Sequence, residues 1–304
     1  MINGIINVYK EKGYTSFDVV AKLRKNLHQK KVGHTGTLDP DAEGVLPICF
    51  GRGTKLCDML TDKSKVYETV MLLGKSTDTQ DVSGDVLKVA EVPAYTEEEL
   101  KIVVQEFTGQ IFQVPPMYSA LKVNGQKLCD LARAGKTVER KPRRIEIYSI
   151  EILSVSLPEI AMRIHCSKGT YIRTLCNDIG ERLGCHACMK ELKRVRVGRF
   201  SLNDAFKVDE IIALYEQGRI DEVVTPTDGM FLQYPSCHVK HYYAKYAYNG
   251  NPLVKKAVTA ERELADGENV RMYLDGEFLA IYQYQEQMKQ YKIVKMFYAN
   301  EDND

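Results

Sequence analysis

The sequence predicts an α+β protein in which one large domain of strands and helices is followed by a small β-rich domain. Two observations lead to this fold class. Strand-like and amphipathic helical patterns follow one another over residues 1–230, whereas residues 231–304 hold short β-like pieces between turns. The chain has 304 residues, of which 44% are hydrophobic, so it can bury one large core and a smaller one.

The first predicted elements lead into and out of a glycine-rich loop. Residues 4–9 predict a strand, and a helix begins at Thr15 or Ser16 and runs to about His28 with apolar side chains on one face. The loop spans residues 33–44. After it, residues 45–50 form an apolar run, and residues 66–73 alternate as in a half-buried strand.

The middle of the chain predicts further helices and an antiparallel pair of strands. The two strands comprise residues 144–155 and 160–166, with a turn near Pro158 between them. The helical patterns cover residues 97–107, 128–134, 171–183 and 207–216. The short strands of the second domain are residues 237–240, 270–274 and 278–283.

Composition excludes several classes of protein. The sequence contains no run of about 18 apolar residues, the length that a membrane span requires. Its first residues lack the pattern of a signal peptide, so we expect a cytoplasmic protein. The eight cysteines are unevenly spaced, which favours buried thiols over a disulfide framework. Cys185 and Cys188 have the spacing of metal ligands, but no second pair accompanies them, so no metal site is expected.

The distribution of charge indicates an anionic polymer as partner, although the formal net charge is only +1. One basic run is usually a solvated face, but three such clusters flank the glycine-rich segments. The clusters are Lys22, Arg24, Lys25, Lys30 and Lys31; Lys136, Arg140, Lys141, Arg143 and Arg144; and Lys190, Lys193, Arg194, Arg196 and Arg199.

The loop at residues 33–44 exposes the carboxylate of Asp39 in a segment suited to close approach by a ligand. Gly33, Gly36 and Gly44 permit backbone conformations that a Cβ would block, and Pro40 holds Asp39 away from the helical region. Asp39 is therefore the candidate nucleophile. The alternative is an ordinary turn whose aspartate caps a helix.

Two further residues are candidates to act with Asp39. Tyr67 could offer a ring for stacking and a phenol for proton transfer, although strands also favour tyrosine in the core. Gly169 marks a strand-to-helix turn that places Arg173 in the first turn of the next helix. A pair with Arg173 would lower the pKa of Asp39 and orient it; the alternatives for Arg173 are a structural ion pair or a phosphate contact.

Several blocks of sequence resemble, in order, the motifs of the TruB family of tRNA pseudouridine synthases. The resemblance covers about residues 3–230, and residues 231–304 resemble the PUA domain of bacterial members. One departure is Cys129, where the family more often has an aromatic residue. The blocks are residues 33–40 with Gly44, Leu46, Gly51, Thr54 and Lys55; residues 65–67; Leu73 and Gly74 with residues 77–79 and Asp81; residues 115–122; and residues 166–174.

The resemblance implies the pseudouridine synthase fold, with a central mixed, mainly antiparallel sheet flanked by helices, and an isomerase that needs no cofactor. It implies Asp39 as a nucleophile that attacks or deprotonates the ribose, or attacks the base, with Arg173 as the ion-pair partner that positions it. Tyr67 would stack on the uracil and remove its C5 proton, and Leu192 would pack on the other side. The other substrate-binding residues that it implies are His34, Gly36, Thr37, Lys55, Lys122 and Tyr171.

The implied substrate is a uridine in the T-loop of tRNA, at position 55, which must be extruded before reaction. His34 would fill the space that the uridine leaves, although a single histidine is more often structural. We expect a monomer that binds the tRNA T-arm and has no membrane or metal partner. Two alternatives stay open: a non-catalytic chaperone that binds and folds tRNA, and a pseudouridine synthase that acts on ribosomal or guide-selected RNA.

Overall fold

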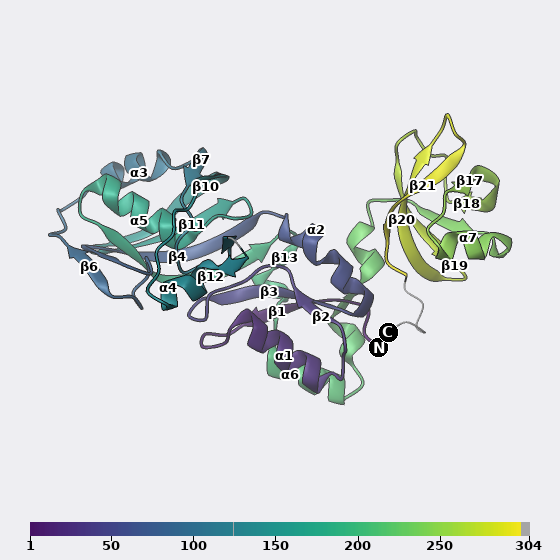
Figure 1. Ribbon diagram of the computed structural model, residues 1–304, viewed down its shortest axis with the longest axis horizontal. Helices are drawn as coiled ribbons and strands as arrows, with labels where there is room; N and C mark the ends of the chain where they lie inside the picture. The colour runs from purple at the N-terminus through teal and green to yellow at the C-terminus, as the bar shows by residue number, and fades with distance from the viewer. Residues whose placement is uncertain (124, 299–304) are drawn as a thin grey trace.

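Two main sheets with the helices around them make up most of the described protein. The computed structural model describes residues 1–123 and 125–298, and within these it holds an 11-stranded sheet, a six-stranded sheet and two two-stranded ribbons. The large sheet and its helices form the body that contains β4 and β12 in Figure 1, and the six-stranded sheet forms the separate green and yellow body. The predicted α+β fold class is confirmed.

The large sheet is mixed and mainly antiparallel, as predicted. Its two parallel pairings are β1 with β14 and β3 with β12. In spatial order the main path is β14 (Phe206–Lys207), β1 (Gly4–Lys10), β3 (Glu43–Phe50), β12 (Ala187–Val197), β4 (Lys65–Leu73), β11 (Glu159–Cys166), β10 (Arg143–Ser156) and β7 (Gly109–Gln113). Three short strands pair beside this path: β2 (Val32–His34), β13 (Phe200–Ser201) and β15 (Val224–Pro226).

Strand β12 was not predicted, although it lies at the centre of the sheet between β3 and β4. Register shifts interrupt its pairing with β4 between Met189 and Glu191 and again between Arg194 and Arg196. These irregularities break the alternation of polar and apolar residues by which a strand is identified in sequence. The segment therefore resembled a solvated basic run.

Helices cover the sheet in two groups, each over its own core. Helices α1 (Ser16–Asn26) and α6 (Val208–Glu216) pack against the β1 and β3 end, and α3 (Glu97–Gln105) and α5 (Ile172–Leu183) pack against the β12 and β10 end. Local signals set several boundaries: Thr15 and Thr96 form capping boxes at α1 and α3, and Gly184 ends α5 with a positive φ. The other elements of this part are α2 (Cys57–Thr61), α4 (Leu128–Arg133), β5 (Lys75–Thr77), β6 (Val86–Val89), β8 (Lys122–Val123), β9 (Gln126–Lys127), and the 3₁₀ helices Gly51–Leu56, Leu202–Asp204, Ile220–Glu222 and Thr227–Phe231.

The C-terminal sheet has more strands than the sequence predicted. Strands β16, β19 and β20 match predicted segments, whereas β17, β18, β21 and helix α7 were not predicted. Ile281 and Phe297 also pack with Ile5 and Cys49 of the large sheet in a shared core, and the domain boundary at residues 230 and 231 stays a prediction. In spatial order the strands are β17 (Leu253–Val254), β21 (Gln290–Met296), β20 (Glu277–Gln285), β19 (Asn269–Leu274), β16 (Ser236–Val239) and β18 (Val258–Ala260), with α7 (Ala244–Tyr248) and the 3₁₀ helices His241–Tyr243 and Lys255–Ala257 beside them.

Among the helices of the described residues, none combines the length and the apolar character that crossing a bilayer requires.

Candidate active site

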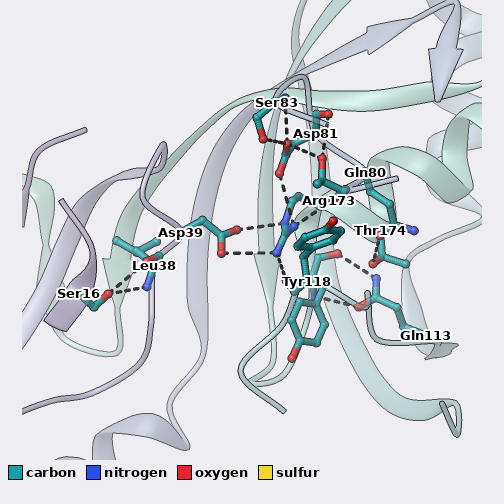
Figure 2. A network of polar contacts seen from close by, with 12 residues as sticks. Ser16, Leu38, Asp39, Gln80, Asp81, Ser83, Gln113, Tyr118, Arg173 and Thr174 are labelled. Carbon is teal, nitrogen blue, oxygen red and sulfur yellow. Dashed lines mark hydrogen bonds and ion pairs between the residues drawn. The ribbon is translucent and has the colours of Figure 1, made fainter. Parts of the chain in front are cut away.

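The loop between β2 and β3 presents Asp39 to a buried arginine. Its start is fixed by pairing of Gly33 with Cys49 across the two strands. Asp39 Oδ2 lies 3.0 Å from Arg173 Nε, and Arg173 Nη2 donates to Asp39 Oδ1 at 3.5 Å. Figure 2 shows the guanidinium and the carboxylate joined by both contacts. Since a strand and not a helix follows the loop, Asp39 serves an ion pair rather than a helix cap.

Arg173 is held by more than Asp39. It is the second residue of α5 and is only 6% exposed. Its Nη1 lies 3.4 Å from Asp81 Oδ2, and it donates to the carbonyl oxygens of Thr79 at 3.0 Å and Tyr118 at 2.7 Å. Asp81 is itself fixed by a hydrogen bond from the Thr79 hydroxyl at 2.8 Å. Contacts other than the one with Asp39 therefore fix the position of the guanidinium (Figure 2).

The segment that follows Pro115 and Pro116 supplies a wall of the site. Gln113 anchors one end, because its side chain donates to the Tyr171 carbonyl at 3.0 Å and accepts from the Tyr171 N–H at 2.8 Å. At the other end, Tyr118 supplies the carbonyl that meets Arg173. Ser119 and Ala120 then line the pocket beside Asp39.

Two further buried cations hold the backbone of the loop. Arg194, 1% exposed, donates from Nε to the Val45 carbonyl at 2.8 Å, from Nη2 to Gly36 at 3.1 Å and from Nη1 to Thr37 at 3.3 Å. Lys10, fully buried on β1, donates from Nζ to the Pro40 carbonyl at 3.1 Å and also contacts the Ala42 carbonyl. Burial lowers the pKa of Lys10 to about 8.

A small pocket and a larger groove meet at Asp39. The pocket has a volume of about 250 Å³, below the ~300–1,000 Å³ typical of drug-sized ligands, so it suits a single base. The groove measures about 880 Å³ and shares Asp39, Arg173 and Leu192 with the pocket. A polymer lying in the groove could therefore place one base in the pocket.

The apolar walls of the pocket include Tyr67, Leu192 and Tyr171. Tyr67 is 7% exposed on β4, and Leu192 is 8% exposed on β12. Burial raises the pKa of Tyr67, and the neighbouring Arg194 guanidinium opposes this rise. Burial also raises the pKa of Tyr171. Both phenols are thus favoured in their neutral form.

The predicted decrease in the pKa of Asp39 is wrong in its net direction. Burial raises the pKa of this carboxyl, the Arg173 guanidinium opposes the rise, and the like charge of Asp81 adds to it. The Asp39 side chain nevertheless keeps 40% of its surface exposed. The ion pair thus orients Asp39 and offsets part of the cost of placing a carboxylate in the pocket.

Two more of the predicted substrate-binding residues line the pocket, and a third, His34, contacts one of them. Gly36 and Thr37 line it, and their carbonyls are the ones that Arg194 holds. His34 is partly buried at the end of β2, where its Nδ1 accepts from the Gly36 N–H at 3.2 Å. Burial lowers the pKa of His34, and Arg194 lowers it further. The neutral ring is therefore favoured.

Lys55 and Lys122 lie outside the lining of the pocket. Lys55 donates to the backbone carbonyls of Phe297 at 3.4 Å and Tyr298 at 3.2 Å, beside the C-terminal sheet. Lys122 is exposed on β8 and lines a neighbouring hollow with Lys127 and Lys136. Their roles as RNA contacts stay predictions.

The third basic cluster is not a uniformly solvated face. Arg194 is buried and bonded to backbone carbonyls, so its assignment to a polymer-binding surface is wrong. In the same cluster Lys193 pairs with Glu43 at 2.8 Å. Sequence reasoning gave no role to Lys10 or Asp81, and it gave Arg194 no role in the site. Of these, Asp81 stood inside a block that resembles the family, which was the available signal.

Two family models match adjoining parts of the chain. Residues 24–172 match the TruB family pseudouridylate synthase N-terminal domain, and residues 173–231 match the tRNA pseudouridylate synthase B C-terminal domain. The junction between the two matches falls between Ile172 and Arg173, within the helix that carries the partner of Asp39.

Relatives and solved structures agree with these matches. The tRNA pseudouridine synthase B of Lachnoclostridium phytofermentans is 52% identical over 97% of this chain and 100% of that protein, and that of Clostridium tetani is 41% identical over 97% and 99%. A structure described as a Cbf5-Nop10-Gar1 complex has a TM-score of 0.70 and 27% identity over 97% of this chain and 85% of its own. The chain described as an H/ACA RNP bound to a substrate RNA containing 2'-deoxyuridine has a TM-score of 0.69 and 25% identity over 98% and 86%. With its fold, its site and its full-length relatives in agreement, this chain belongs to the TruB family of pseudouridylate synthases.

Proposed function

We propose that this protein converts the uridine at position 55 in the T-loop of tRNA to pseudouridine, with Asp39 as the nucleophile. The observation that carries the proposal is the ion pair of Asp39 with Arg173 where a base-sized pocket meets a larger groove. The names of the relatives support tRNA as the substrate.

The reaction exchanges one bond to the ribose for another. The bond from C1' to N1 of the uracil breaks, the uracil rotates, a bond from C1' to C5 forms, and C5 loses its proton while N1 ends with one. Asp39 either attacks C1' or removes a ribose proton, with attack on the base as the third route. Since the pocket admits one base, the uridine must first leave its stack in the RNA.

The walls of the pocket have separate roles in this reaction. Tyr67 stacks on the uracil and takes the C5 proton, and Leu192 packs on the opposite side. Only the phenolate of Tyr67 can take this proton; burial disfavours that form, and the neighbouring Arg194 guanidinium favours it. Arg173 holds the carboxylate of Asp39 towards the ribose, and His34 fills the space that the extruded uridine leaves.

The test compares Asp39→Asn with Asp41→Asn, a matched change on the same loop that also lines the groove. Tritium release from C5-labelled uridine in a tRNA transcript measures turnover, and filter binding measures RNA affinity. We expect Asp39→Asn to lose turnover by more than about 10³-fold with RNA binding kept, and Asp41→Asn to remain near the wild type. An Asp39→Asn protein that keeps a tenth of the rate would exclude Asp39 as the nucleophile.

The position of the target is tested with a transcript in which uridine 55 is replaced by cytidine. We expect this transcript to bind but to release no tritium from its other uridines. Release at the rate of the unaltered transcript would overturn the assignment of position 55 while leaving the isomerase activity in place.

A further inference from the structure

The side chain of Phe17 is an exposed aromatic ring beside the loop at residues 33–44, which carries Asp39. Phe17 is the second residue of α1, its side chain is 68% exposed, and it lines the same groove as Asp39. Full burial of a phenylalanine side chain would stabilise the fold by roughly 1.5–3 kcal/mol, and this ring forgoes most of that.

Packing of α1 does not explain the ring. The face of α1 that meets the core consists of Ser16, Val19, Val20 and Leu23, all of which are buried. Phe17 lies outside that set, and phenylalanine has only average helix propensity. The helix would fold as well with a polar residue at this position.

The residues on both sides of Phe17 are rigidly held. Thr15 and Asp18 form a capping box, in which the Thr15 N–H donates to Asp18 Oδ2 at 2.8 Å and the Asp18 N–H donates to Thr15 Oγ at 3.0 Å. Ser16 Oγ accepts from the N–H of Leu38 at 2.9 Å, and Leu38 precedes Asp39 (Figure 2). The first turn of α1 is thus bonded directly to the catalytic loop.

The groove around Phe17 carries a small excess of positive charge. Apart from Arg173 and its partners Asp39 and Asp81, its charged lining consists of four basic and two acidic residues, among which Arg133 faces Asp130 at 3.9 Å and Lys190 pairs with Glu159. These are Lys12, Lys127, Arg133, Lys190, Asp41 and Asp130. Aromatic rings set among cations are the pattern by which proteins hold unpaired nucleotides, because every base offers a face for stacking.

We propose that Phe17 stacks on an unpaired base of the RNA, other than the target uridine, and so positions the opened loop over Asp39. Extrusion of the target separates neighbouring bases that had stacked on it, and the ring gives one of them a new partner. This inference rests on the proposed function. The hydrogen bond between Ser16 and Leu38 fixes the position of Phe17 relative to Asp39, because these residues precede Phe17 and Asp39 in the chain.

The natural chain contains no tryptophan, so Phe17→Trp places a single fluorescent reporter at the proposed contact. The control is Ile102→Trp, because Ile102 is 59% exposed on the acidic helix α3, outside the groove lining and the basic clusters. We expect a T-arm hairpin to quench the Phe17→Trp emission saturably and to leave the Ile102→Trp emission unchanged. Equal responses of the two proteins to bound RNA overturn the proposal.

Kinetics provide the second arm, with the full chain and a tRNA transcript. Phe17→Ala should raise KM by about 5- to 150-fold with kcat kept, and Phe17→Tyr should restore KM. The slope of log affinity against log salt should stay unchanged, whereas Lys127→Ala should reduce it by about one. A wild-type KM in Phe17→Ala overturns the role of Phe17. Wild-type turnover of the same transcript tests the proposed function separately, so failure of one is distinguished from failure of the other.

Discussion

Arg173 and Arg194 are both almost fully buried beside the same loop, yet they support different parts of it. Arg173, on α5, meets the carboxylates of Asp39 and Asp81. Arg194, on β12, donates to the carbonyls of Gly36, Thr37 and Val45. One arginine thus orients the candidate nucleophile, and the other fixes the backbone that carries it.

The orientation of the Asp39 carboxylate and the shape of the loop backbone therefore depend on different arginines. Removal of Arg173 leaves the carboxylates of Asp39 and Asp81, which both line the groove, without the cation that they share. Removal of Arg194 takes the donor from the buried Val45 carbonyl, where an unsatisfied group costs about 1–3 kcal/mol, and from the partly exposed carbonyls of Gly36 and Thr37. We therefore expect the first loss to affect mainly turnover and the second to affect mainly the free energy of unfolding.

The largest effect is expected from Arg173→Lys. Lysine keeps the positive charge but lacks the planar fork that faces Asp39 through Nε and Nη2, so the carboxylate loses its orientation. We expect single-turnover rates to fall by at least about 100-fold, the effect of a misplacement near 1 Å. Tritium release measures the rate, and circular dichroism checks the fold. A rate within tenfold of the wild type would show that charge alone suffices.

The next effect is expected from Arg194→Met. The change removes the donor to the buried carbonyl of Val45 and to the partly exposed carbonyls of Gly36 and Thr37, and we expect the free energy of unfolding to fall by about 2–4 kcal/mol and turnover by about tenfold. Urea denaturation measures the loss of stability. Arg196→Met is the control, because Arg196 lies two residues away on the same strand and is exposed. Equal denaturation midpoints for the two variants would contradict a structural role for Arg194.

Local signals explain which parts of the site the sequence could predict. The start of α1 and the end of α5 follow from a capping box and a glycine, which act within a few residues. Arg173 was predicted because it lies in the first turn of a helix after a glycine turn. The resemblance to a family then connected it with Asp39 across the chain.

The sequence could not predict the supports beneath the loop, because burial decides their role. Lys10 and Arg194 look like ordinary surface cations, and only the pairing of β1, β3 and β12 places them behind the loop. The bulges in β12 removed the pattern that would have shown its burial. The net direction of the Asp39 pKa shift also depends on burial and on Asp81, which only the folded arrangement supplies.

A smaller effect is expected from Gly44→Ala, which tests how closely β12 must approach the loop. Gly44 has a φ of +111°, and a Cβ there would lie 2.2 Å from the backbone oxygen of Arg194. Gly13→Ala is the control, because Gly13 also has a positive φ, of +86°, but nothing lies within 4 Å of its Cβ position. Beyond the loss in the control, we expect about 1–3 kcal/mol less stability from the overpacking, measured by urea denaturation. Equal losses would show that φ alone matters.

The smallest effect is expected from Asp39→Asn on stability. Its sign shows whether the ion pair with Arg173 costs stability, in contrast to the stabilising bonds of Arg194. The pKa of Asp39 is raised in the folded protein, so the fold disfavours its ionised form. Above that pKa the wild type carries the cost, and below the ordinary aspartate value both states are protonated and the cost disappears. Asp39→Asn should therefore raise Tm at neutral pH, and the gain should vanish as the pH falls. Because the side chain is 40% exposed, solvent screens the charge, and we expect only about 1–2 °C.

Calorimetry at pH 7 and pH 3 measures this change, with Asp41→Asn as the control for removing one negative charge from the loop. Arg173 keeps Asp81 and the carbonyls of Thr79 and Tyr118 when Asp39 is neutral, so it is not left unpaired. A fall in Tm at pH 7 would mean that the ion pair stabilises the fold, as the bonds of Arg194 do. A rise confined to neutral pH would show that the pair costs stability and persists because it holds the carboxylate where the ribose must meet it.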